Sequence, residues 1–306
     1  MLSAKSNASI VAGLLLAVTF WGGNNAGTKW LVQTWPPVWI GTTRFFCAGL
    51  LLLGLLRFTK LLGTSHALRP EIKRRLWWRG GLSLATYIVA FTYAVKFTSA
   101  SHVALYLGAA PVWALLWEGL SDRMSHGAWR YAAATLALTG VFVLLWPALR
   151  DSHANLLGEI LGLASSILWT NYGRQCRSLA ATLSGAEVSA HTMWRGGALL
   201  LPISIAELIA RKTLPLGGMQ IAVQSYCILA GGVFAFAIWS NALRHWSTSR
   251  VFLFNNLIPL STMTWAHFCI GEAITPTFWV AMILVAAGVV LGQMKFQTPT
   301  QATPVE

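Results

Sequence analysis

Two arginines stand inside long apolar stretches of this sequence, where charged side chains are rare. Arg44 lies within residues 36–56 and Arg195 within residues 186–207. An arginine near the centre of a lipid bilayer costs about 2.5–3.5 kcal/mol, so its side chain usually faces a wet cavity or a polar partner. We therefore expect each arginine either to bind or gate a charged solute, or to hydrogen-bond helix-end carbonyls and lock the fold.

Amide side chains are also concentrated in the apolar stretches. Six asparagines lie there: Asn24, Asn25, Asn171, Asn241, Asn255 and Asn256. Amides can hydrogen-bond both the carboxylate and the amino group of a small metabolite, which would suit a solute-binding site. The alternative is that they join one packed helix to another, a contact worth about 0.6 kcal/mol per pair in one measured membrane protein.

Other titratable side chains give weaker signals. Glu118 and Glu272 lie near the predicted ends of apolar stretches. We expect both to be solvated at the membrane interface, with proton coupling through either as the alternative. The four cysteines have no metal-ligand spacing and are expected to be small buried hydrophobes.

The elements that must position these residues follow from composition. The chain has 306 residues, of which 56% are hydrophobic and 10% charged, whereas about 25% of residues are charged in a soluble domain. About 20 apolar residues cross the roughly 30 Å hydrocarbon core as a helix. The sequence therefore predicts an all-α integral membrane protein with ten transmembrane helices. Their expected ranges are 8–30, 36–56, 77–97, 100–119, 127–147, 156–176, 186–207, 219–242, 251–271 and 275–294.

The basic residues predict the orientation. With a cytoplasmic N-terminus, fifteen Lys and Arg residues lie in inside segments and five in outside segments. Cytoplasmic loops carry an excess of these cations, so we expect both termini, including the tail at 295–306, in the cytoplasm. The cations are spread over short joints rather than gathered on one face, which argues against a nucleic-acid partner. The densest run, Arg57 to Arg79, could also bind anionic membrane lipid.

The chain repeats itself internally. An offset of 148 residues aligns Trp21 with Trp169, Ser99 with Ser247, Pro111 with Pro259 and Gly140 with Gly288, and an offset of 151 aligns Arg44 with Arg195. The sequence thus predicts two five-helix repeats, at 8–147 and 156–294. Because five is odd, the second repeat must be inverted in the membrane, which is an arrangement typical of alternating-access carriers.

Other function classes lack their motifs. The sequence contains no HExxH zinc pair, no aspartate cluster for a metal diphosphate site and no Gly-rich phosphate loop. An enzyme is therefore not expected, although a membrane-embedded enzyme stays a distant alternative, and neither a cofactor nor a metal is expected. ATP cannot drive the protein through a P-loop of its own. We expect a monomer whose partners are a small-molecule substrate and membrane lipid.

Several short motifs resemble the EamA family of the drug/metabolite transporter superfamily. They are Phe20, Trp21, Gly22 and Asn24; Arg44 and Phe45; Thr98, Ser99 and Ala100; Pro111 and Pro259; and Gly271 with Glu272. The resemblance covers about residues 8 to 294 and implies a secondary carrier. It implies a cavity lined by Trp21, Asn24, Tyr93, Tyr106, Trp169, Asn171, Asn241 and Asn256. In that arrangement Arg44 and Arg195 lie on helices that line the cavity less.

These observations predict an inner-membrane secondary transporter that exports a small polar metabolite, such as an amino acid or a compound derived from one. Two alternatives stay open within transport. One is uptake, and the other is efflux of aromatic or cationic drugs through a pocket that includes the deeper tryptophans Trp21, Trp113, Trp117, Trp169 and Trp239.

Overall fold

The protein is described by a computed structural model, and every regular element in the described residues is a helix. The structure describes residues 4–63, 65, 67–110, 112–113, 117, 128–150, 155–211, 214–245 and 253–293. The elements are α1 (Ala4–Leu31), α2 (Pro37–Phe58), α3 (Pro70–Arg75), η1 (Leu76–Gly81), α4 (Leu82–Phe97), α5 (Ala100–Gly108), α7 (Ala128–Arg150), α8 (Leu156–Leu179), α9 (Gly185–Arg211), α10 (Gly218–Tyr226), η2 (Cys227–Phe234), α11 (Ala235–His245), η3 (Leu253–Leu257), α13 (Ile258–Ile270) and α14 (Pro276–Gln293).

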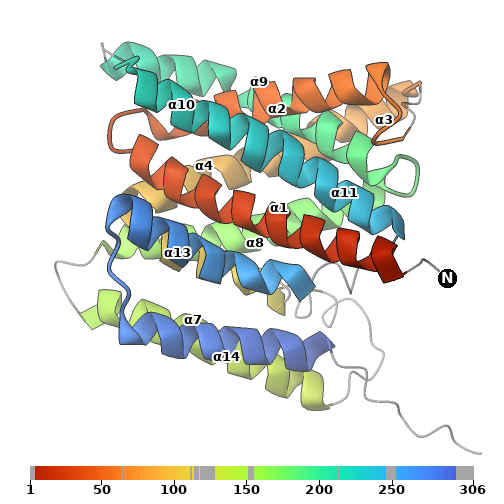
Figure 1. The fold of residues 1–306 in the computed structure, drawn as a ribbon. Helices are drawn as coiled ribbons and strands as arrows, with labels where there is room; N and C mark the ends of the chain where they lie inside the picture. Colours follow the sequence, from red (N-terminus) through yellow and green to blue (C-terminus); the bar gives the residue numbers. More distant parts are fainter. Residues whose placement is uncertain are drawn as a thin grey trace, which may run out of the picture.

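The long helices lie side by side and share two ends (Figure 1). We call the end where α1 begins the N-terminal end of the bundle and the opposite one the far end. Because successive helices alternate in direction, α1 runs from the N-terminal end, whereas α8 starts at the far end (Figure 1). The first helices of the two predicted repeats therefore run in opposite directions.

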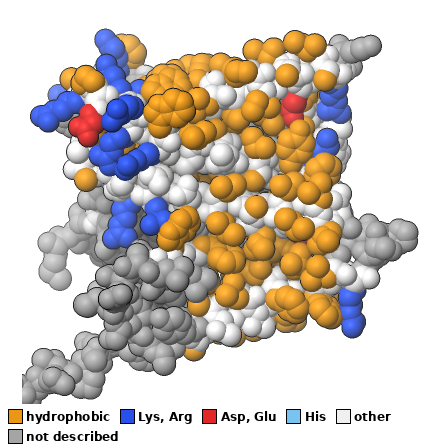
Figure 2. Space-filling model, turned by 180° about the vertical axis from the view of Figure 1, so that it is seen from behind, with side chains coloured by type: hydrophobic (Ala, Val, Ile, Leu, Met, Phe, Trp, Pro, Cys, Tyr) orange, Lys and Arg blue, Asp and Glu red, His pale blue; other side chains and the backbone are white. Residues whose placement is uncertain are grey.

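The helical stretches have the dimensions and surface of membrane spans. Five described stretches are long and apolar enough to cross a bilayer: Ala8–Leu31, Pro37–Phe58, Pro70–Phe97, Gly185–Arg211 and Gly218–Ala242. Figure 2 shows hydrophobic side chains over the middle of one face and Lys and Arg side chains gathered toward its two margins. A band of this kind matches lipid tails between two polar headgroup layers. The chain is a multi-pass membrane protein, while the count of ten spans and the side of the termini stay predictions.

Helix boundaries follow from local chemistry. Pro37 occupies the first turn of α2, where its missing N–H has no partner to lose. At the end of α13, Gly271 has a φ of 69°, which is a left-handed conformation that favours glycine, and its N–H donates to the carbonyl of His267. Pro276 then starts α14 five residues later. These signals make sharp turns between tightly packed helices.

The α7–α14 crossing displays the two-repeat structure at atomic scale. A Cβ added at Gly140 would lie 2.8 Å from the carbonyl oxygen of Ala281, and one added at Gly288 would lie 2.6 Å from that of Ala133. Both the two glycines and the two alanines are related by the 148-residue offset. Each helix thus presents the same glycine to the same position of its counterpart, which allows the two backbones to touch.

One π-helical segment interrupts the third helix of each repeat. One is η1, which ends in Gly80 and Gly81, and the other is η2, which contains Gly231 and Gly232. The two glycine pairs are 151 residues apart, the offset that relates Arg44 to Arg195. The helices that carry these arginines pack on the opposite repeat's π-helical segment, α2 on η2 and α9 on η1. Hydropathy alone predicted plain helices here, since it carries no information on an i→i+5 ladder.

Candidate functional site

Trp21 and Asn24 join α1 to η2. The Trp21 Nε1–H donates to the carbonyl oxygen of Gly231 at 3.0 Å, and its ring centroid lies 5.1 Å from that of Trp239. Asn24 is buried, and its Nδ2 donates to Asn25 Oδ1 at 3.3 Å. A Cβ on Gly231 would meet the Asn24 side chain at 2.8 Å, so the glycine makes room for it. Both predicted residues lie against Gly231; the Trp21 hydrogen bond joins α1 to η2, whereas the Asn24 hydrogen bond stays within α1.

Trp169 and Asn171 lie on α8 with different surroundings. The Trp169 ring is half-buried and packs against the rings of Tyr87 and Tyr172, with centroid distances of 4.9 Å and 5.3 Å. Asn171 instead opens onto a polar hollow between α4 and α8, at the N-terminal end of the bundle. Its Oδ1 accepts only a long contact of 3.5 Å from Gln175 Nε2. Among the described residues, the Asn171 amide thus has one weak hydrogen-bond partner and lies against the hollow.

The hollow, named here the α4–α8 hollow, has a volume of about 510 Å³. It is lined by seven residues that combine amides, hydroxyls and a guanidinium with two apolar side chains: Trp78, Arg79, Leu82, Ser83, Thr86, Asn171 and Gln175. The hollow is open rather than enclosed, and its polar groups could fix the orientation of a small ligand. Among the eight residues predicted to line the cavity, only Asn171 lines this hollow.

Tyr93 is held by a carboxylate at the far end. Its hydroxyl donates to Glu207 Oε1 at 2.7 Å, while Glu207 Oε2 accepts from the backbone N–H groups of Val38 at 2.9 Å and Trp39 at 3.2 Å. Glu207 of α9 thereby satisfies the first amides of α2, where the helix dipole favours a negative charge. One carboxylate ties together α2, α4 and α9.

We predict that Tyr93→Phe lowers the free energy of unfolding by about 1.5–3 kcal/mol, because it removes a hydrogen bond to a charged group. Thermal unfolding of the detergent-purified protein measures this loss. Tyr226→Phe is the matched control, since the Tyr226 hydroxyl makes only a 3.4 Å contact with the carbonyl of Phe20. Unchanged stability of Tyr93→Phe would show that the hydrogen bond from Tyr93 to Glu207 does not stabilise the fold. Transport by the variant at equal folded protein then tests the substrate role predicted for Tyr93.

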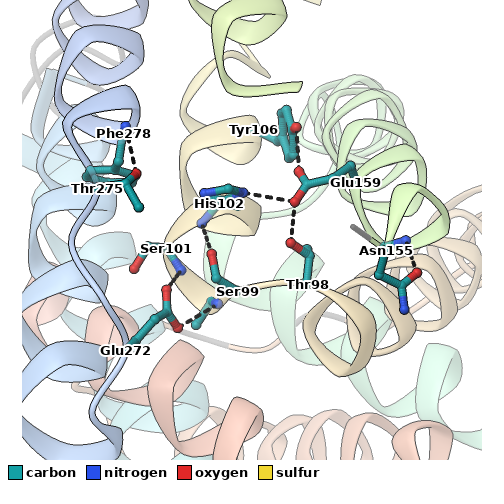
Figure 3. A network of polar contacts seen from close by, with 12 residues as sticks. Thr98, Ser99, Ser101, His102, Tyr106, Asn155, Glu159, Glu272, Thr275 and Phe278 are labelled. Atoms are coloured by element: carbon teal, nitrogen blue, oxygen red, sulfur yellow. Dashed lines mark hydrogen bonds and ion pairs between the residues drawn. The ribbon is translucent and has the colours of Figure 1, made fainter. Parts of the chain in front are cut away.

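Tyr106 belongs to a second carboxylate cluster at the far end (Figure 3). Its buried hydroxyl donates to Glu159 Oε2 at 2.6 Å, and His102 Nδ1 lies 2.9 Å from Glu159 Oε1. The hydroxyl of Thr98 also donates to Glu159 Oε1. Ser99 holds the donor segment in place, since its Oγ caps α5 by accepting from His102 N at 3.0 Å.

Two glycines make the cluster possible. A Cβ on Gly162 would meet the ring of Tyr106 at 2.7 Å, and one on Gly158 would meet the backbone nitrogen of Thr98 at 2.8 Å. They flank Glu159 on α8 and let the donor side chains approach its carboxylate closely. The sequence analysis did not single out Glu159. The available signal was a carboxylate inside an apolar range, in the pattern Gly158, Glu159 and Gly162.

Two more charged residues bind backbone groups where α4 ends and α5 begins. Glu272 accepts from the backbone N–H groups of Ala100 and Ser101, both at 3.0 Å, at the first turn of α5 (Figure 3). Lys29 Nζ donates to the carbonyl of Thr98 at 2.6 Å and to that of Val95 at 2.9 Å. Glu272 is therefore half-buried and bonded, rather than solvated as expected, whereas Glu118 and Pro111 lie outside the described residues.

Arg44 and Arg195 are buried in equivalent places. Their exposed fractions are 6% and 5%, and the Nε of each has no hydrogen-bond partner among the described residues. The Arg44 guanidinium lies 4.6 Å from the ring centroid of Phe45. Arg195 Nη1 contacts both Nδ1 and the carbonyl oxygen of His191, each at 3.1 Å. Both charges are thus retained in the interior with incomplete hydrogen bonding.

The remaining predicted residues lie elsewhere. Asn241 is exposed near the end of α11, and Asn256 is half-buried in η3. The eight residues predicted to line the cavity therefore fall into separate groups, on α1 with η2, on α8, at two far-end carboxylates, and near the N-terminal end. Their joint role in substrate binding stays a prediction.

Together these features define a class. Antiparallel halves with matching crossings, built from membrane-spanning helices, are typical of a secondary carrier. The chain belongs to the EamA-like transporter family, whose profile matches residues 8–146 and, a second time, residues 156–292. The chain is therefore a membrane transporter of the drug/metabolite transporter superfamily, and its relatives point away from an enzyme.

Two of the similar proteins have names that concern export. A "Probable amino-acid metabolite efflux pump" of Escherichia coli (strain K12) is 22% identical over 285 residues, covering 90% of this chain and 91% of that protein. A "Probable terminal-alkyne amino-acid exporter" of Streptantibioticus cattleyicolor is 26% identical over 215 residues, covering 69% and 70%. An "Uncharacterized transporter" of Archaeoglobus fulgidus is 24% identical and covers 89% and 99%.

A solved crystal structure shares the fold. It superposes with a TM-score of 0.62 at 19% sequence identity and covers 93% of this chain and 98% of its own. Identity this low supports the fold alone and says nothing of the substrate.

Proposed function

We propose that the protein is a secondary transporter of the inner membrane that exports an amino acid or an amino-acid-derived compound by alternating access. The observation that carries the proposal is the α4–α8 hollow at the N-terminal end, which the positive-inside rule assigns to the cytoplasm. The far end, by contrast, is closed by Glu159, Glu207 and Glu272. A substrate would enter the hollow from the cytoplasm and leave when the far end opens.

The lining of the hollow suits a zwitterionic metabolite. Arg79 offers guanidinium donors for a carboxylate, and the amide oxygens of Asn171 and Gln175 can accept from an amino group. Trp78 and Leu82 supply an apolar surface beside these groups for the rest of the molecule. The names of the E. coli and Streptantibioticus relatives support the same substrate class.

We predict that Asn171→Ala lowers export by at least about tenfold, because it removes a donor and an acceptor from the hollow. Metabolites in the medium of cells producing the wild type are compared with those from cells producing Asn171→Ala or Arg195→Ala at equal membrane abundance. Gln33→Ala is the matched control, since this amide is exposed at the far end. An amino-acid-like compound that accumulates outside only with active protein names the substrate.

Two outcomes would oppose the proposal. Identical metabolite profiles for all variants would exclude export of a cellular metabolite, and uptake would then be tested. Competition by planar aromatic cations, without competition by amino acids, would instead favour drug efflux, with the cluster of Trp21, Phe236 and Trp239 as the candidate pocket.

A further inference from the structure

The contact between α5 and α8 at the far end differs from the other carboxylate ties. Glu207 and Glu272 bind backbone amides, whose protonation does not change near neutral pH. Glu159 binds side chains only, and one of them is the imidazole of His102. Histidine is the side chain whose charge ordinarily changes between pH 5 and 8. The strength of this contact therefore depends on the charge of an imidazole, whereas the carboxylates of Glu207 and Glu272 accept from backbone N–H groups and, for Glu207, the Tyr93 hydroxyl.

We propose that Glu159 and His102 bind one proton as a pair, and that this proton drives the transport cycle. The inference rests on the proposed export function and adds its energy source. A group at the far end is placed to take a proton from the outside, the side to which that function releases the substrate.

The pair is built to take up a proton and to respond to it. The His102 side chain is 25% exposed, whereas that of Glu159 is nearly fully buried at 6%. Without the proton the pair carries a charge of −1, and with it the imidazolium and carboxylate sum to zero. A charge-assisted bond across the joint would favour the closed far end by about tenfold or more. Proton binding thus closes this end after the substrate has left, and the pair must release the proton to the cytoplasm before the far end opens again, because only a proton that crosses the membrane supplies energy.

The contact between Glu159 and His102 connects the two halves of the protein. α5 lies in the predicted first repeat and α8 in the second, so the contact between Glu159 and His102 resists their separation at the far end. The 148-residue offset places Val11 opposite Glu159 and Phe254 opposite Tyr106. The site is therefore present once, not twice, so it can impose a direction on an otherwise symmetric pair of repeats.

The contacts between α8 and residues 106–113 continue along α8 toward the α4–α8 hollow. Further along α8, Ser166 Oγ donates to the Tyr106 carbonyl at 2.5 Å and accepts from Trp113 Nε1 at 2.9 Å, and Thr170 Oγ1 donates to the Ala110 carbonyl at 3.2 Å. Asn171, which lines the hollow, follows directly. About 18 Å of one helix therefore connects the proton pair to the proposed substrate site.

The surroundings of the pair contain few other charges. From α1, Lys29 binds the carbonyl of Thr98, and from the loop after α13, Glu272 binds the first amides of α5. From α5 itself, Tyr106 donates its hydroxyl to Glu159. Lys29 and Glu272 are opposite in sign and each is occupied by backbone groups. A second imidazole, that of His267 on α13, lies 3.1 Å from the backbone carbonyl oxygen of Glu272, whereas the His102 imidazole contacts a carboxylate.

The test uses the full-length protein in proteoliposomes with a 14C-labelled mixture of L-amino acids as the probe. Counterflow against the unlabelled mixture measures carriage without a gradient, and an acidic interior measures proton-driven accumulation. We expect Glu159→Gln to retain counterflow within about threefold of the wild type and to lose gradient-driven accumulation by at least about tenfold. His102→Gln should behave in the same way and serves as the second variant if Glu159→Gln does not fold. Glu71→Gln is the matched carboxylate control, since Glu71 is exposed on α3, and it should keep both activities.

The outcomes separate the proton site from the substrate. Proton-driven accumulation by Glu159→Gln equal to that of the wild type would overturn the inference, as would a wild type that exchanges label but ignores the gradient. Absence of wild-type counterflow would instead refute the proposed substrate class. In that case a pH jump on the purified protein, followed with a pH-sensitive dye, decides the matter. The wild type should then take up about one proton more than Glu159→Gln/His102→Gln, and equal uptake would refute the site.

Discussion

Replacing Gly288 with leucine is expected to lower the melting temperature of the purified protein by roughly 2–10 °C, or to prevent recovery of folded protein. A Cβ at this position would lie 2.6 Å from the backbone nitrogen of Ala137 and 2.6 Å from the carbonyl oxygen of Ala133. Both neighbours are backbone atoms of α7, so no side-chain rotation can relieve the overlap. The α7–α14 crossing would have to separate, and overpacking of this kind typically costs about 1–3 kcal/mol or more.

The matched control is Gly173→Leu in α8. A Cβ there meets nothing within 4 Å, and the residue is exposed. Leucine is the better helix former by nearly 1 kcal/mol, so the control should be as stable as the wild type or slightly more stable. Size-exclusion chromatography after heating measures both variants. If Gly288→Leu were as stable as Gly173→Leu, the close crossing of α7 and α14 would be refuted.

The sequence predicts the course of the helices well because apolar length is a strong local signal. The range 36–56 corresponds to α2 at Pro37–Phe58, and the range 186–207 to α9 at Gly185–Arg211. The π-helical segments η1 and η2 could not be predicted, because they depend on tertiary contacts of Gly80, Gly81 and Gly232 with helices distant in sequence. The second half of the predicted range 100–119 lies largely outside the described residues.

Residue roles were harder to predict than helices. Six asparagines in apolar stretches predicted either interhelical hydrogen bonds or a substrate role; Asn24 and Asn25 are buried, whereas Asn241 is exposed. Glu159 gave a weak signal because its partners, His102 and Tyr106, are 57 and 53 residues away in sequence. A single carboxylate in an apolar stretch does not reveal which side chains will surround it. Only packing of α5 on α8 brings the donors to it.

The two ends of the bundle are chemically different, which bears on mechanism. At the far end three carboxylates each join helices that are separate in the fold, whereas the N-terminal end contains the α4–α8 hollow. Transport by alternating access requires that such ties break and re-form with each cycle. Backbone-bound Glu207 and Glu272 restrain the ends of helices, while the pair of Glu159 and His102 provides a contact whose strength can be changed by a proton.

Replacing Arg44 or Arg195 with methionine is expected to raise the stability of the folded protein by about 1–4 kcal/mol while lowering transport at least about tenfold. Each guanidinium is nearly fully buried, and the Nε of each has no partner among the described residues. A buried charge with incomplete hydrogen bonding costs free energy that a well-packed apolar side chain of similar length does not. Stability alone would therefore not preserve either arginine.

The positions of the two arginines indicate which role a buried charge has there. Arg195 lies against Gly81 of η1, where an added Cβ would be 3.1 Å from the arginine Cβ, and α2, which carries Arg44, packs on η2. Each charge thus sits beside a π-helical segment of the opposite repeat, a type of segment frequent at functional sites. Arg211→Met, an exposed arginine on the same helix as Arg195, should change neither stability nor transport. A loss of stability in Arg195→Met together with unchanged transport per folded molecule would assign the arginine to the fold alone. A gain in stability with lost transport would show that the buried charge is retained for movement of the halves or for the solute.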